Sequence, residues 1–155
     1  MTTVTRIKRK SRLSTLIDRA GGISVGVALK QAARNLAPMR SQALEVVADL
    51  AGQLEALAPP SPEQTPERLE EVYRIGLGVL DAIGPFDMPR LHRVAWGLCD
   101  LVDRYEPGRP FDWRVVEVHI RALRLFLSMG PDADGAAFDE VIAGLDKAVA
   151  RQRTV

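Results

Sequence analysis

Apolar residues recur at every third or fourth position through most of the chain after residue 24, which is the spacing that builds one face of an α-helix. Ser24 is a residue type that often caps a helix N-terminus, and Pro38 breaks or kinks the apolar stripe that follows it. A second stripe runs from Met39 to Leu57. The pattern leaves open whether these two stripes form one kinked helix or two separate helices.

Breaks that contain proline and glycine divide the rest of the chain into further helical segments. A proline-rich loop over residues 58–64 precedes a helix that we expect Thr65 to cap. Gly84 and Pro85 end that helix, and Pro89 begins the next one. Short loops of this kind are typical of neighbouring helices in a bundle.

Two glycines, Gly76 and Gly78, lie inside the helix that follows Thr65. Each costs about 1 kcal/mol relative to alanine in a helix interior. We therefore expect a neighbouring helix to approach closely at these positions. A contact with a ligand is the alternative explanation.

The most apolar segment follows Asp112, which is expected to cap it, and contains five polar residues: Arg114, Glu117, Arg121, Arg124 and Ser128. At 100° per residue these fall within an arc of about 80°, so this helix should be central in the fold. A last helix is expected over residues 134–151. No segment alternates apolar and polar residues as a strand would, so the predicted fold is all-α: a bundle of five to six helices, forming one domain over residues 13–155.

Residues 1–12 are polar and basic and lack any hydrophobic period, so we predict a disordered arm there. Its cations are Arg6, Lys8, Arg9, Lys10 and Arg12. Such an arm could bind nucleic acid, anionic lipid or an acidic protein surface, or could serve only as a solubilising tail. Because it has no aromatic residue on which bases could stack, nucleic acid is the less favoured partner.

The composition points away from several classes of protein. A single cysteine, Cys99, rules out an intrachain disulfide and fits a reducing compartment, so we expect a cytoplasmic protein. No apolar run approaches the roughly 18 residues of a membrane span. Clustered metal ligands, a phosphate-binding loop and a G-x-S-x-G nucleophile motif are all missing from the sequence, so no metal, cofactor or catalytic residue is expected.

The two histidines, His92 and His119, are the remaining candidates for chemistry. His119 lies opposite the polar strip of its helix and should be buried. The simple interpretation is a neutral imidazole hydrogen-bonded to the backbone or to a carboxylate. A buried pH-sensitive switch is the sharper alternative.

His92 lies at the margin of the apolar face of its own helix, flanked by Arg90 and Arg93. A half-exposed histidine on a bundle helix, with cations nearby, is what a histidine phosphotransfer protein needs to attack an aspartyl phosphate. The phosphotransfer motif resembles H-x-L-K-G, however, and this chain has Ala95 in place of the lysine and Trp96 in place of the small residue. These departures favour a structural or interface role for His92.

Four residues share this edge and form the candidate partner-binding surface: His92, Arg93, Trp96 and Asp103. Tryptophan is enriched among the residues that contribute most to binding energy in protein interfaces. The simpler alternative is that Trp96 covers a junction between helices. The other tryptophan, Trp113, opens a helix and is expected to pack inward.

Residues 7–13 (IKRKSRL) and 21–32 (GGISVGVALKQA) resemble the start of CheE-type proteins, which are small accessory proteins of alphaproteobacterial chemotaxis clusters. The resemblance covers about the first 35 residues, and the later helices match only in length and helical pattern. It brings no catalytic motif. It implies a cytoplasmic auxiliary role in two-component signalling, with a response-regulator receiver domain or the chemotaxis kinase complex as partner.

The leading hypothesis is therefore a non-enzymatic adaptor or modulator of bacterial signalling that binds other proteins. The first alternative is phosphotransfer through His92. The second is association with nucleic acid through residues 6–12. The sequence does not indicate an oligomeric state.

Overall fold

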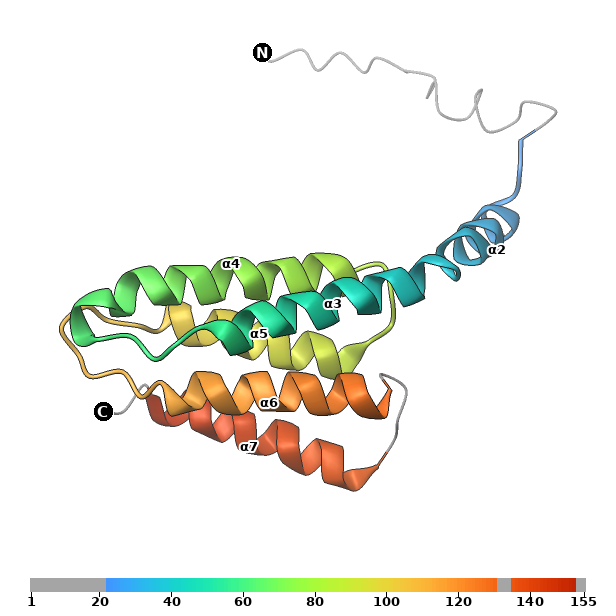
Figure 1. The fold of residues 1–155 in the computed structure, drawn as a ribbon. Helices are drawn as coiled ribbons and strands as arrows, with labels where there is room; N and C mark the ends of the chain where they lie inside the picture. The colour runs from blue at the N-terminus through green and yellow to red at the C-terminus, as the bar shows by residue number, and fades with distance from the viewer. Residues whose placement is uncertain (1–21, 131–134, 153–155) are drawn as a thin grey trace, which may run out of the picture. The chain divides into compact units, whose positions relative to one another are not determined.

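The computed structural model describes residues 22–130 and 135–152, and these residues form α-helices without any β-strand (Figure 1). The elements are α2 (Val25–Leu36), α3 (Met39–Ala56), the 3₁₀ turn η1 (Pro62–Gln64), α4 (Thr65–Ile83), α5 (Pro89–Asp103), α6 (Arg114–Met129) and α7 (Ala136–Gln152). The predicted all-α fold is confirmed. The basic arm predicted over residues 1–12, and with it the proposed nucleic-acid contact, lies outside the described residues and stays a prediction.

The chain divides after Ala37 into two compact units, residues 1–37 and residues 38–155. The helix α2 belongs to the first unit, and α3 to α7 belong to the second. The two apolar stripes on either side of Pro38 are thus two helices. The prediction of one domain over residues 13–155 differs from this division, in which the bundle begins at Pro38. Because α2 has no buried residue, the core is built from α3 onward.

The five helices of the second unit run up and down in turn, each antiparallel to the one before it (Figure 1). The helix α5 packs against α4, α6 and α7, and α6 packs against α3, α5 and α7. The predicted central position of α6 therefore holds, and α5 shares it. The turn into α4 and the loop from α5 to α6 meet at one end of the bundle, where Pro60, Thr65 and Phe111 line a common hollow.

Close approach between helices explains the two glycines inside α4. A Cβ atom built on Gly76 would lie 3.1 Å from Sγ of Cys99 on α5. One built on Gly78 would lie 3.3 Å from Leu50 on α3. The expectation of neighbouring helices at these positions is confirmed, and α4 contacts two of them through residues without side chains.

Side-chain hydrogen bonds mark the ends of several helices. Oγ of Ser24 accepts a hydrogen bond from the backbone N–H of Val27, as expected of an N-cap. Asp112 accepts one from the backbone N–H of Arg114 at the start of α6. Thr65, in contrast, is a buried first residue of α4 and not its cap: the N-cap of α4 is Gln64, which makes no side-chain cap hydrogen bond, and Ser61 caps the preceding turn η1.

The outward stripe of α6 differs from its predicted polar strip. Arg124 is half-buried because its guanidinium reaches Glu55 on α3 through two hydrogen bonds of 2.9 and 2.7 Å. Arg114, Arg121 and Ser128 of the predicted strip are exposed, and beside them lie three large exposed apolar residues: Val118, Leu125 and Met129. The helical wheel placed the five polar residues on one side of α6. The contact with Glu55 on α3 partly buries one of them, Arg124.

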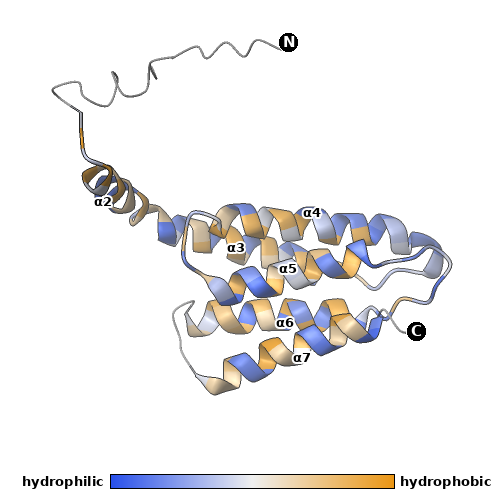
Figure 2. Ribbon diagram, turned by 180° about the vertical axis from the view of Figure 1, so that it is seen from behind, coloured by the Kyte–Doolittle hydropathy of each residue, from blue (hydrophilic) through white to orange (hydrophobic). Residues whose placement is uncertain are grey.

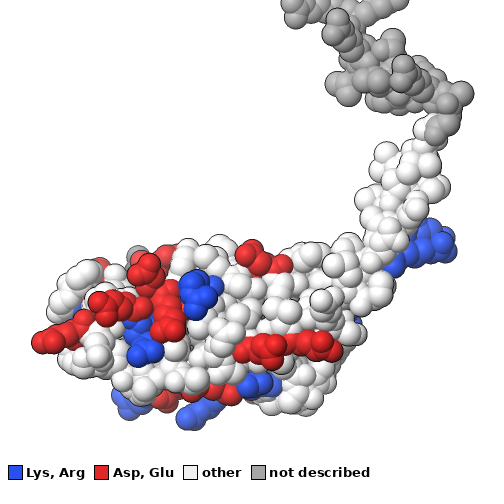
Figure 3. Space-filling model, turned by 45° about the horizontal axis from the view of Figure 1, so that its top comes forward, with Lys and Arg blue, Asp and Glu red and all other residues white. Residues whose placement is uncertain are grey.

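Acidic side chains are frequent on the face over α3 and α4 (Figure 3). The exposed ones include Glu45, Asp49, Glu67, Glu70 and Asp81. Residues 45–155 hold 12 Lys and Arg against 19 Asp and Glu, a formal net charge of −7. In the part of the chain that the structure describes, no helix has the length and apolar character needed to cross a membrane.

Candidate functional site

The predicted binding edge lies on α5, where His92 and Trp96 are neighbours one turn apart. Their rings stack with centroids 6.2 Å apart and planes inclined by 10°. Both residues are exposed, and Trp96 keeps 54% of its surface open to solvent. This exposure is what a partner-binding residue needs, and the other tryptophan, Trp113, is buried as expected. The chain thus presents a stacked aromatic pair on a packed bundle helix.

Arg93 lies beside this pair but is engaged by α7. Its guanidinium donates two hydrogen bonds, of 3.1 and 2.9 Å, to the carboxylate of Asp146. The same carboxylate raises the pKa of Arg93. Arg90 lies one turn earlier, with its guanidinium 5.1 Å from the ring centroid of Phe138 and 3.8 Å from Asp139. The cations expected to attract an acidic partner therefore lie against carboxylates of α7.

Asp103, the fourth predicted residue, is not part of the same cluster. It is the last residue of α5 and comes seven residues after Trp96, which corresponds to about 10 Å along the helix axis. It lines a hollow at the end of the bundle, beside the loop that follows α5. The structure brings His92, Arg93 and Trp96 together and leaves Asp103 apart.

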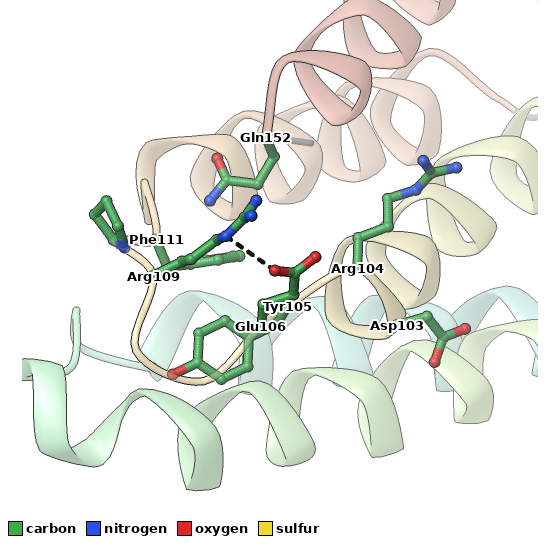
Figure 4. Close-up of a pocket in the computed structure, with 8 residues that line it drawn as sticks. Asp103, Arg104, Tyr105, Glu106, Arg109, Phe111 and Gln152 are labelled. Atoms are coloured by element: carbon green, nitrogen blue, oxygen red, sulfur yellow. Dashed lines mark ion pairs between the residues drawn. The ribbon is translucent and has the colours of Figure 1, made fainter. Parts of the chain in front are cut away.

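The hollow beside Asp103 is a small polar recess (Figure 4). Its volume is about 200 Å³, below the roughly 300 Å³ at which ligand pockets usually begin. Arg109 forms an ion pair of 2.9 Å with Glu106, and Gln152 points toward them, whereas the side chains of Asp103 and Arg104 point away. The charged groups that meet in this recess are paired with each other, and they do not form a nucleophile and base arrangement.

A more open groove lies between the end of α3 and the start of α6. Its volume is about 500 Å³, and Leu54, Leu57, Trp113 and Ile120 form its apolar part. The polar residues at its rim are Glu55, Glu117 and Arg121. Of these, Glu55 is already bound to Arg124, which lowers the pKa of the Glu55 carboxyl. The groove therefore has a defined shape, but its polar residues do not form an acid and base pair that could act in catalysis.

Comparison with protein-family models, with curated proteins and with solved structures gave no match to this chain.

His119 on α6 is fully buried, as its position on the helical wheel predicted. Its Nδ1–H donates to the backbone carbonyl of Val115 at 2.7 Å, so a neutral imidazole here carries no proton on Nε2. Nε2 has no partner and faces Gly97 of α5, where a Cβ atom would lie only 2.8 Å away. Burial lowers the pKa of His119, opposed by the Val115 hydrogen bond and by the charge of Asp146. The neutral, backbone-bound imidazole expected from the sequence is the form that this site holds.

Cys99 lies on α5 under Gly76 and is buried. Burial, with a smaller contribution from the charge of Asp103, raises the pKa of its thiol to about 11. A thiol with that pKa is a poor nucleophile at neutral pH. Across the described ranges 22–130 and 135–152, no three His, Cys, Asp or Glu side chains gather in a way that could hold a metal ion.

Sequence reasoning missed the acidic residues of α7 that bind the arginines of α5. Asp139 and Asp146 are seven residues apart and so share one face of α7. That spacing was visible in the sequence. The pairing with α5 was not, because it depends on which face of α7 turns toward which helix. Gly97 was missed for the same reason.

Proposed function

We propose that this protein is a non-enzymatic adaptor or modulator in bacterial two-component or chemotaxis signalling that binds other proteins in the cytoplasm. The observation that carries the proposal is the exposed Trp96 ring stacked on His92. Tryptophan at the centre of an interface commonly contributes 2 kcal/mol or more, so an exposed and ordered one is a strong candidate for a contact residue.

The surroundings of Trp96 hold it in place before any partner arrives. Its helix packs against α4, α6 and α7, and Arg93 ties that helix to Asp146 through two parallel hydrogen bonds. The backbone that carries Trp96 is thus fixed, so a partner would not have to order this helix on binding. This supports a surface that recognises a partner by shape and aromatic contact.

The resemblance of the first 35 residues supplies the partner class: a response-regulator receiver domain or the chemotaxis kinase complex. The charges near Trp96 indicate which kind of surface such a partner would present. Arg90 and Arg93 already lie against Asp139 and Asp146, so an acidic pocket alone would gain little at this face. A depression lined by apolar side chains, into which the indole of Trp96 fits, is the complementary surface.

A photo-crosslinking experiment tests this proposal at the level of one residue. p-Benzoylphenylalanine is placed at position 92 in the full chain, and in a matched control at position 118, where Val118 is exposed on α6. Receiver-domain proteins or the chemotaxis kinase should be crosslinked from position 92 and not from position 118. Equal crosslinking from both positions, or none to either class of protein, would contradict the proposal.

Phosphotransfer through His92 is the second candidate, and one observation favours it: the imidazole is exposed on a bundle helix. In such a step an imidazole nitrogen attacks the phosphorus of an aspartyl phosphate, the P–O bond breaks, and the aspartate carboxylate leaves. Two features stand against it. Ala95, where the motif has lysine, is buried, and the indole of Trp96 lies along one face of the imidazole.

A phosphorylated receiver domain tests this second candidate directly. The wild-type chain should acquire acid-labile phosphate that the His92→Gln variant does not. His119 gives an internal comparison because its imidazole is buried. Absence of label on the wild-type chain, with donors that phosphorylate an established phosphotransfer protein, would remove this candidate and leave the adaptor proposal intact.

A further inference from the structure

The helix α2 exposes more apolar surface than a short surface helix needs. None of its residues is buried, and Figure 2 shows much of it in the orange of hydrophobic residues. Val25 is 76% exposed and Leu29 66% exposed, and Ile23 and Val27 are also open to solvent. Apolar side chains gathered in this way mark a surface that is covered by something else.

Most apolar positions of α2 lie on one side and its charged positions on the other, although Val27, about 200° from Val25, falls beside Arg34. At 100° per residue, Val25, Leu29 and Leu36 fall within an arc of about 40°, while Lys30 and Arg34 lie about 100° or more from that arc. Ala28, Ala32 and Ala33 widen the apolar side. The helix is therefore amphipathic, and both of its charged residues are basic.

The surrounding sequence has the same sign of charge. Between Asp18 and Glu45 there is no acidic residue, whereas this stretch contains Lys30, Arg34 and Arg40. Residues 1–44 hold nine Lys and Arg against one Asp, a formal net charge of +8, in contrast to the −7 of the remaining chain. Within this stretch, the unit that contains α2 (residues 1–37) holds eight Lys and Arg against one Asp, so it is strongly basic and its charge complements an anionic surface.

We propose that α2 lies in the plane of an anionic lipid surface, with Val25, Leu29 and Leu36 inserted among the acyl chains and Lys30 and Arg34 against the headgroups. An apolar face together with basic residues is the combination that holds an amphipathic helix at a membrane interface. With 12 residues, α2 is about 18 Å long and would lie on a bilayer whose apolar core is about 30 Å thick.

The charge of α2 argues against the other occupants of its apolar face. A second copy of α2 would cover Val25 and Leu29 but would offer no anionic group to Lys30 and Arg34, which lie on the other side of the helix. A nucleic acid would satisfy Lys30 and Arg34 but would leave Val25 and Leu29 in water. An anionic membrane satisfies both sides of the helix, and this inference does not depend on the role proposed for Trp96.

Co-sedimentation of the full chain with vesicles tests the proposal. The vesicles are either an equal mixture of phosphatidylglycerol and phosphatidylcholine or phosphatidylcholine alone. We expect binding to the anionic vesicles, little binding to the neutral ones, and a loss of roughly tenfold in affinity when salt is raised from 50 to 500 mM. No binding to anionic vesicles at low salt would overturn the proposal.

Two double variants test the apolar side and the charged side of α2 separately. Val25→Gln combined with Leu29→Gln removes apolar contacts at constant charge, and Lys30→Gln combined with Arg34→Gln removes charge. Each pair should weaken vesicle binding by roughly tenfold. The matched control is Val118→Gln combined with Met129→Gln, which alters exposed apolar residues on α6 and should leave binding unchanged.

Two results with these variants would overturn the proposal. One is vesicle binding that stays intact in both α2 variants. The other is a mass in solution, measured by light scattering without vesicles, that falls from dimer to monomer in Val25→Gln with Leu29→Gln, because a second copy would then be the occupant. Circular dichroism of each variant confirms that the bundle remains folded.

Discussion

Gly97 on α5 lies directly against the imidazole of His119 on α6. A Cβ atom at position 97 would come within 2.8 Å of Nε2 and 3.0 Å of Cδ2. Both atoms belong to a side chain that is fully buried and fixed by its hydrogen bond to Val115. The contact sets how closely α5 and α6 approach, and α5 is the helix that carries Trp96.

The first prediction follows from that contact. Gly97→Ala should lower the free energy of unfolding by about 1–3 kcal/mol, because the added methyl group overpacks a site that the buried imidazole cannot leave. Gly144→Ala on α7 is the matched control, since a Cβ there meets nothing within 4 Å. The control should be neutral or stabilise by up to about 1 kcal/mol. Urea unfolding measures both, and equal effects at the two positions would contradict the contact.

The second prediction concerns pH. Because burial lowers the pKa of His119 below its usual 6.5, the unfolded chain binds a proton in a window where the folded chain does not. The free energy of unfolding should therefore decrease as the pH falls below about 6.5 toward the lower folded pKa, by at most about 1.4 kcal/mol per pH unit. Above that window His119 contributes no pH dependence.

Urea unfolding of the wild-type chain and of His119→Leu, between pH 7.5 and pH 5, isolates this effect. The wild-type chain should lose stability over that range more steeply than the variant. Glu55 does not interfere, because the pKa of its carboxyl is lowered from 4.5 and its stabilisation is lost only at more acidic pH. Parallel pH profiles for the two chains would show that His119 is not the titrating group.

The third prediction concerns the thiol of Cys99. With its pKa raised to about 11, roughly one thiol in a thousand is ionised at pH 8. An aromatic disulfide reagent should therefore label the folded chain much more slowly than the chain in 8 M urea. Rapid labelling of the folded chain at pH 8 would mean that the α4–α5 contact at Gly76 opens readily.

Local signals in the sequence predicted most of the fold. Helix periodicity and the breaks at Pro38, Gly84 and Pro85 placed the helices, because these residues act on the backbone where they stand. The division of the chain after Ala37 was not predicted, since an apolar stripe does not show to which unit its helix belongs.

The candidate site was predictable only in part. The exposed edge of α5 with His92 and Trp96 followed from the helical wheel. The pairing of Arg93 with Asp146 joins residues 53 positions apart, and Asp103 proved to lie too far along α5 to share the site. Both outcomes depend on how helices pack, which a local pattern does not specify.

The affinity of purified receiver domains and chemotaxis kinase from the source cells, measured by calorimetry, tests the central claim most directly. Trp96→Ala is compared with Leu125→Ala, which truncates an exposed apolar residue on α6. The adaptor account predicts that at least one of these proteins binds the wild-type chain, that Trp96→Ala weakens binding by roughly 30-fold or more, and that Leu125→Ala does not. Binding that is unaffected by Trp96→Ala, or no binding to either class of protein, would contradict it.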